Sequence, residues 1–178
     1  MTLLDFFKNT SNLKNISRQG WIDKLSIEHP ESVADHSYSM AIMAMIISDL
    51  ENYNSEKILK MVLLHDLAES KIGDLTPDQI SKDEKEQIEN NAFSEIIEKL
   101  PNSIKLQYTE IWKEYQKQTS RESQIVHQID RLEMALQAKI YEKSSLSKKD
   151  ISPFLETAKA DITHPKLKAL FTKIIEDK

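Results

Sequence analysis

Apolar residues recur every three or four positions along most of the chain, which is the spacing of one face of an α-helix. The clearest example is residues 122–143. Its apolar stripe consists of Ile125, Ile129, Leu132, Leu136 and Ile140. No alternating run bounded by turn residues predicts a strand, and two glycines in 178 residues leave few positions for tight hairpins. The pattern therefore predicts an all-α fold.

Capping residues mark where the predicted helices begin. Ser32 with Asp35, and Ser81 with Glu84, have the spacing of a capping box. Further helix starts are expected at Ser55, near Asn102, at Ser120, at Ser152 with Pro153, and at Thr163 ahead of Pro165. The Ser/Lys-rich segment 144–150 is interpreted as a solvated connection within one domain.

The length of the chain suits a single domain with a substantial core. We expect one helical bundle over residues 1–178. Its core should cover about 15–145, with C-terminal helices at about 150–176 packed on it.

Composition narrows the kinds of ligand. The chain has 24 Lys and Arg against 29 Asp and Glu, so its formal charge of -5 argues against nucleic acid as a partner. It has no cysteine, so a metal could be held only by histidine and carboxylate side chains. The longest apolar stretch, residues 40–47, is too short to cross a bilayer, and the N-terminus lacks the features of a signal peptide. A cytoplasmic protein without a membrane partner is expected.

Two predicted helices carry polar side chains on a core-facing edge. His36 shares its helix face with Met40, Met43, Ile47 and Leu50. Asp130 flanks the apolar stripe of the long helix, one turn from both Val126 and Met134. A buried carboxylate without a partner is costly. Both side chains are therefore expected to have a polar or ionic partner.

A third helix adds two more such groups. The helix expected to begin at Ser55 continues through Glu69 in this interpretation. His65 and Glu69 then share a face with Ile58 and Val62. Asp66 lies one step round from His65 and three residues before Glu69, so the potential metal ligands accumulate in one place.

Each of these residues has a simpler explanation when taken alone, as a hydrogen-bonded core histidine or an ion-paired aspartate. His29, His127 and His164 are given that structural interpretation. Together, however, two imidazoles and two carboxylates on three helices supply the lone pairs that a divalent cation needs. The candidate ligands are His36, His65, Asp66 and Asp130.

This donor set leaves the identity of the metal open, because manganese, cobalt, iron, nickel and zinc all accept nitrogen and oxygen ligands. A second, weakly held Mg²⁺ near Glu69 and Asp74 is a further alternative. The two glycines, Gly20 and Gly73, are expected in short loops, where glycine permits positive φ or the approach of a ligand; Gly73 also suits a helix C-cap.

The order His36, His65-Asp66, Asp130 resembles the H…HD…D signature of the HD superfamily, whose members are helical metal-dependent phosphohydrolases. The neighbouring strings are closer still. They are RQGW, PESVADHSYSMAIMAM, VLLHDLAESKIGDLTP and QIDRLEMALQAKIYE. Together, over about residues 3–170, they resemble the HD-domain 5′-deoxynucleotidases, in the branch of HD domain-containing protein 2.

The resemblance implies that the substrate is a deoxyribonucleoside 5′-monophosphate, cleaved to deoxynucleoside and phosphate, and that the protein is a homodimer. It implies the same four metal ligands. Glu69 and Asp74 would be catalytic, with Asp74 also close to the sugar. Arg18 and Trp21 would bind the phosphate and the nucleoside. A guanidinium suits this task, since it offers two parallel donors to a phosphate.

Other HD activities have different signatures. Ser70 follows HDLAE here, whereas alarmone hydrolases of the superfamily resemble one another in an HD-x-x-E-D run, and the Gly-Tyr-Pro signature of cyclic-dinucleotide esterases is absent from the sequence. Two alternatives remain open: a non-catalytic HD regulator that binds metal and nucleotide, and a helical scaffold with structural histidines. Glu69 and Asp74 argue against the regulator, since binding alone would not need them.

Overall fold

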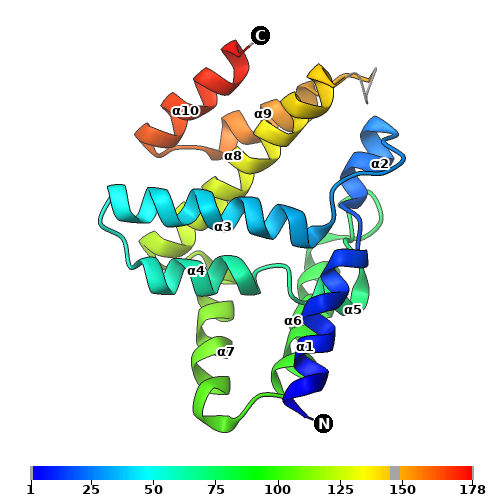
Figure 1. The fold of residues 1–178 in the computed structure, drawn as a ribbon, viewed down its shortest axis with the longest axis vertical. Coiled ribbons are helices and arrows are strands. Elements are labelled where there is room, and N and C mark those ends of the chain that lie inside the picture. The colour runs from blue at the N-terminus through cyan, green and yellow to red at the C-terminus, as the bar shows by residue number, and fades with distance from the viewer. Residues whose placement is uncertain (1, 145–148, 178) are drawn as a thin grey trace.

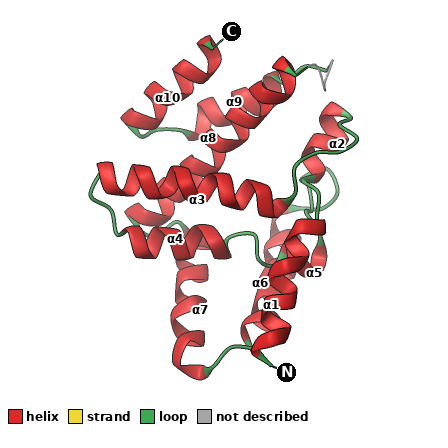
Figure 2. Ribbon diagram, viewed as in Figure 1, coloured by secondary structure: helices red, strands yellow, loops and turns green. Residues whose placement is uncertain are grey.

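The computed structural model describes residues 2–144 and 149–177, and these fold almost entirely into helices (Figures 1 and 2). In chain order they are α1 (Leu3–Asn12), the 3-10 helix η1 (Leu13–Asn15), α2 (Gln19–Leu25), α3 (Val33–Leu50), α4 (Ser55–Leu64), α5 (Glu69–Ile72), α6 (Lys82–Ile97), α7 (Asn102–Lys117), α8 (Arg121–Lys143), α9 (Ser152–Asp161) and α10 (Pro165–Glu176). The all-α prediction is confirmed. Most of the Ser/Lys-rich connection predicted at 144–150 lies outside the described residues.

The predicted caps explain where several helices begin. Ser32, Ser81 and Ser120 each accept a hydrogen bond from the backbone at the third residue of the helix that follows. The start of α4 at Ser55 is also as predicted, although its cap is Asn54, whose side chain accepts from Lys57 N. Thus local hydrogen bonding sets the helix boundaries, within a residue or so of the sequence-based expectation.

The main core lies where α3, α4 and α8 pack against one another. Figure 1 shows α3 and α4 running side by side, with α8 passing behind both and α7 meeting α4 from below. Ile125, Ile129 and Leu132 of α8 are buried there, as predicted. Two stripe predictions were wrong: Ile140 is 47% exposed and Leu50 is 59% exposed. Leu50 is the last residue of α3, and Ile140 lies on a different side of α8 from Ala138 and Tyr141, which are buried.

A second, smaller cluster joins α2 to the C-terminal half of α8 and to α9. Its apolar residues are Trp21, Leu25, Ile27, Met134, Ala138, Tyr141, Ile151 and Phe154. The helices α9 and α10 both pack on α8. This packing fixes α2 against α8 and α9, and it thereby positions Arg18, the residue just before α2. Within the described ranges, no helix is long and apolar enough to cross a membrane.

Two local predictions were wrong, and both errors affect the candidate site. The helix through residues 55–69 is not continuous: α4 ends at Leu64 and α5 begins at Glu69, with turns between them. Gly20 is not in a loop but in the first turn of α2. Gly73, by contrast, caps α5 with a φ of 78°, a backbone conformation that glycine adopts without strain.

Candidate metal centre

The first turn of α3 carries His36, whose side chain is completely buried. Its Nδ1 lies 2.7 Å from Glu133 Oε2 of α8. Because an ionised carboxylate can only accept, Nδ1 carries the hydrogen of this bond. In the neutral imidazole, Nε2 is therefore the unprotonated atom. This arrangement is typical of metal-binding histidines, which donate from one ring nitrogen and coordinate through the other.

The interruption between α4 and α5 positions the next two candidate ligands. His65 ends α4, and the turns after it are closed by hydrogen bonds from Leu67 N to Leu64 O and from Glu69 N to Asp66 O. His65 Nδ1 donates to Val62 O at 2.6 Å, so its Nε2 is also the free ring atom in the neutral form. The turn lets two consecutive side chains point to the same place, which a regular helix would separate by about 100°.

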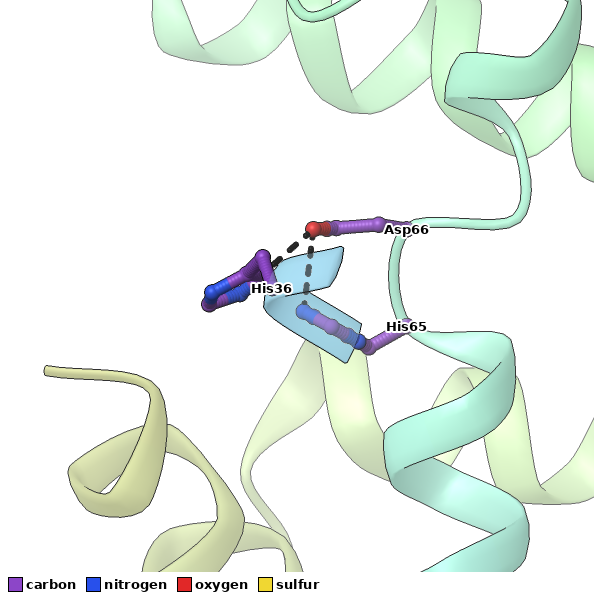
Figure 3. Close-up of side chains that lie close together, drawn as sticks. All are labelled: His36, His65 and Asp66. Carbon is purple, nitrogen blue, oxygen red and sulfur yellow. Dashed lines mark ion pairs between the residues drawn. The ribbon is translucent and has the colours of Figure 1, made fainter. Parts of the chain in front are cut away.

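The ligand atoms of His36, His65 and Asp66 all lie within 4.8 Å of one another (Figure 3). Asp66 Oδ2 is 3.0 Å from His65 Nε2 and 3.9 Å from His36 Nε2. Asp130 reaches the same group from α8, with Oδ1 3.2 Å from His36 Nε2. The structure thus brings three of the four proposed ligands into one group and places the fourth, Asp130, beside His36.

The electrostatics of this cluster suit a cation. The Nε2 atoms of both histidines are enclosed and form no hydrogen bond within the described part of the chain. Burial and Arg18 lower the pKa of His36, but Asp130 and Glu133 outweigh them and raise it to about 9. The carboxylates therefore favour positive charge at this imidazole. A divalent cation supplies such charge while using the Nε2 lone pairs, so the residues present fit a metal.

The two aspartates are held in their ionised, metal-binding form. Although burial raises the pKa of Asp66, His65 and Arg18 lower it well below its ordinary value. Burial likewise raises the pKa of Asp130, and His36 and Arg131 more than offset it. Asp130 Oδ2 lies 3.3 Å from Arg131 Nη1, which leaves Oδ1 directed at His36.

Arg18 is the residue that immediately precedes α2, and its side chain extends to the cluster. The backbone there is fixed to the start of α3, because Arg18 N donates to Glu31 O and Val33 N donates to Ile16 O. Arg18 Nη1 lies 3.3 Å from Asp66 Oδ2. Burial lowers the pKa of Arg18, but the surrounding carboxylates raise it above its ordinary value, so the guanidinium stays charged.

Asp74 and Asp66 both lie near enough to Glu69 for their charges to act on it. Asp74 Oδ2 accepts a hydrogen bond from Gln19 N at 2.8 Å, which ties the loop after Gly73 to the start of α2. Glu69 is 2% exposed, and burial together with Asp66 and Asp74 raises its pKa well above the ordinary value. The clusters of potential metal ligands found within the described residues do not include a Glu69–Asp74 pair, so the second Mg²⁺ site gains no support.

The structure places Trp21 differently from its neighbour Arg18. The indole is 2% exposed and packs against Phe154 and Tyr141, with ring centroids 4.4 and 5.4 Å away. Its Nε1 donates to Glu31 Oε1 at 2.9 Å. Direct contact with a nucleoside stays a prediction, and in this conformation the chain itself covers the ring.

Two glutamates near His36, the buried Glu133 and the partly buried Glu31, were not foreseen from the sequence. Glu133 holds the Nδ1 of His36, and the carboxylate of Glu31 lies close to both. Burial and the nearby Glu133 raise the pKa of Glu31 to about 7. The only sequence signal for Glu133 is its position one turn after Asp130, on the same side of α8. Glu31 has no such signal, because it lies in the loop before α3.

Comparison with known proteins shows which family the chain belongs to. The model of the HD domain family matches residues 10–170. The chain belongs to the HD-domain family. Among its relatives, this HD-domain protein is 36% identical to the human 5′-deoxynucleotidase HDDC2 over 174 residues, which covers 97% of this chain and 84% of the human protein. It is 37% identical to the 5′-deoxynucleotidase HDDC2 of Dictyostelium discoideum over 186 residues, covering 98% and 97% of the two chains.

A solved structure resembles this HD-domain protein over nearly its full length. The PH0347 protein of Pyrococcus horikoshii superposes with a TM-score of 0.81 at 30% sequence identity, covering 97% of this chain and 98% of that one. The helical architecture that positions the cluster is therefore shared with a relative known from experiment.

Proposed function

We propose that this HD-domain protein is a metal-dependent 5′-deoxynucleotidase that hydrolyses deoxyribonucleoside 5′-monophosphates to deoxynucleoside and phosphate. The observation that carries the proposal is the turn at His65-Asp66, which brings both side chains beside His36. The names of the relatives, 5′-deoxynucleotidases over nearly the whole chain, support the choice of substrate. HD phosphohydrolases are metal-dependent, and this donor set is compatible with that property.

His36, His65, Asp66 and Asp130 would hold the metal, whose identity among manganese, cobalt, iron, nickel and zinc stays open. When bound, a divalent cation supplies a water that is easier to deprotonate and polarises a phosphoryl oxygen. Both effects address the main obstacle, because phosphate monoesters are among the slowest esters to hydrolyse in water.

The remaining polar residues would act on the substrate. Arg18, adjacent to Asp66, would bind the phosphoryl oxygens, to which a guanidinium can donate two parallel hydrogen bonds. Glu69 would hold a proton and deliver it to the leaving 5′ oxygen, in keeping with its raised pKa. Asp74 would accept a hydrogen bond from the sugar through the oxygen that Gln19 does not engage.

The experiment that tests the activity is phosphate release from a panel of ribo- and deoxynucleoside monophosphates after chelation and return of single metals. We expect release only with a divalent cation, and faster release from the deoxynucleotides. Binding of metal and nucleotide without phosphate release would instead favour the non-catalytic regulator. Protein that binds no metal would favour a helical scaffold.

Substitution of Arg18 by Lys should impair the reaction even though the charge is kept. The ammonium is a point charge and cannot replace the paired donors, so we expect kcat/KM to fall about 10- to 100-fold and inorganic phosphate to inhibit less strongly. Steady-state kinetics and the inhibition constant of phosphate measure both effects. The matched control is Arg121→Lys. The side chain of Arg121 is 61% exposed and contacts Glu122 and Asn52, which are not residues of the proposed site. Wild-type constants for Arg18→Lys would place Arg18 outside the phosphate site.

We also propose a homodimer, supported by apolar side chains that α3 leaves exposed. These are Ile42, Met45, Ile46 and Leu50, which are 39 to 59% exposed. Of these four, Ile46 also lines an apolar groove of about 460 Å³ between α3, α8 and α10. Contiguous apolar surface of this kind marks protein interaction sites. The molar mass in solution, compared with the 20.6 kDa of one chain, tests the proposal.

A further inference from the structure

The loop that connects α5 to α6 carries Asp74 and contains turns but no helix or strand. It contacts both α2 and α6 (Figure 1). A segment without the hydrogen bonds of a helix or sheet keeps its place through contacts with its neighbours. These contacts therefore determine where the carboxylate of Asp74 lies.

Two contacts hold this loop against α2, next to Arg18. Asp74 Oδ2 accepts a hydrogen bond from Gln19 N at 2.8 Å. The hydroxyl of the buried Thr76 lies 3.4 Å from Asp23 Oδ2, one turn further along α2. Gln19 engages Oδ2 of Asp74, so Oδ1 is the oxygen with which Asp74 would meet the sugar.

Lys85 holds the same loop from α6. Its Nζ donates a hydrogen bond of 2.6 Å to the carbonyl oxygen of Leu75, the residue directly after Asp74. Glu89 Oε1, one turn along α6, lies further from the ammonium, at 3.5 Å. The side chain of Lys85 is 29% exposed, so most of it is covered by the protein. Because a hydrogen bond from a charged donor is stronger than one between neutral groups, this contact restrains the backbone beside Asp74.

We propose that Lys85 is a positioning residue for the reaction, which fixes the backbone next to Asp74 and thereby holds the Asp74 carboxylate where the sugar binds. This inference rests on the proposed function, which gives Asp74 its contact with the sugar. With Lys85 bonded to Leu75 and Gln19 bonded to Asp74, the carboxylate is in place before the substrate arrives. A group that is already ordered loses little freedom on binding. Without Lys85, ordering of the loop would oppose binding of the nucleoside part.

The test is Lys85→Met, which keeps an unbranched apolar side chain and removes the ammonium. Binding of 2′-deoxyadenosine and of inorganic phosphate to the metal-loaded protein is measured by NMR titration, beside kcat/KM for 2′-deoxyadenosine 5′-monophosphate. We expect the Kd of 2′-deoxyadenosine to rise and kcat/KM to fall, each about 10-fold, as for loss of one hydrogen bond from a charged group. The Kd of phosphate and the metal content should not change, because Arg18 and the metal ligands keep their contacts.

A double-variant cycle with Asp74→Ala separates positioning from a general structural role. If Lys85 acts through Asp74, Lys85→Met should weaken binding of 2′-deoxyadenosine no further once residue 74 is alanine. The matched control is Lys82→Met at the exposed start of α6, which should leave every value as in the wild type.

Three results would overturn the proposal. They are an unchanged Kd of 2′-deoxyadenosine in Lys85→Met, an equal further loss in the Asp74→Ala background, and a loss of phosphate affinity as large as that of the nucleoside. A wild type that binds no 2′-deoxyadenosine would overturn it as well. Failure of the proposed function gives a separate result: the wild type would release no phosphate, while the nucleoside Kd of wild type and Lys85→Met would still decide the role of Lys85.

Discussion

Substitution of Asp66 by Ala should abolish both metal binding and phosphate release. Asp66 is the carboxylate nearest to His65 Nε2, at 3.0 Å, and its loss removes a charged ligand that no other side chain at this position can replace. We expect no stoichiometric metal by elemental analysis and a turnover at the level of a metal-free blank. The unfolding free energy should also fall, by about 1 to 3 kcal/mol, since Arg18 and His65 lose their partly buried partner.

The control for this variant is Asp83→Ala, because Asp83 lies on the exposed first turn of α6. It should keep full metal content and activity. Chemical denaturation of both variants separates a loss of ligand from a failure to fold. If folded Asp66→Ala protein retained one metal per chain and normal turnover, the assignment of the ligands would be wrong.

Substitution of Glu69 by Gln should also abolish most of the turnover, but, unlike Asp66→Ala, it should leave metal binding intact. Glu69 is buried near Asp66 and Asp74, but it does not belong to the clusters whose atoms could share a metal. An amide keeps the shape of the side chain and cannot exchange a proton with the leaving group. General acid or base catalysis contributes about 10² to 10⁴-fold, and we expect kcat to fall by that factor.

Elemental analysis and steady-state kinetics on the same preparation test this prediction, with Glu86→Gln on the exposed side of α6 as the control. A Glu69→Gln enzyme with bound metal and an unchanged kcat would remove Glu69 from the mechanism. Loss of metal together with activity would instead make Glu69 part of the metal site.

The sequence alone determined the helices and the identity of the candidate ligands. Apolar spacing and the caps at Ser32, Ser81 and Ser120 are local properties, set by residues within one or two turns of each other. The four proposed ligands could be chosen because histidine and aspartate at apolar positions are costly without partners. Their type and order, read with the family resemblance, were sufficient to name them.

Tertiary packing decided how these residues meet and what supports them. The break after Leu64, which the helical pattern did not predict, turns His65 and Asp66 toward His36. Glu133 lies 97 residues from His36 along the chain, and only the packing of α8 on α3 brings them to 2.7 Å. Helical periodicity reports which face of a helix is apolar, but it carries no information on which face of another helix will cover it.

The same limit explains the residues whose surroundings were unexpected. Trp21 follows Arg18 by three positions, and the sequence analysis therefore assigned both residues to substrate binding. In the structure the indole packs against Phe154, whereas Arg18 contacts Asp66. Nothing local in the sequence relates Tyr115 to His65 or His127, yet its ring contacts the rings of both. Contacts between residues far apart in the chain arise only when the helices pack, since packing is the step that brings their side chains within a few ångströms of one another.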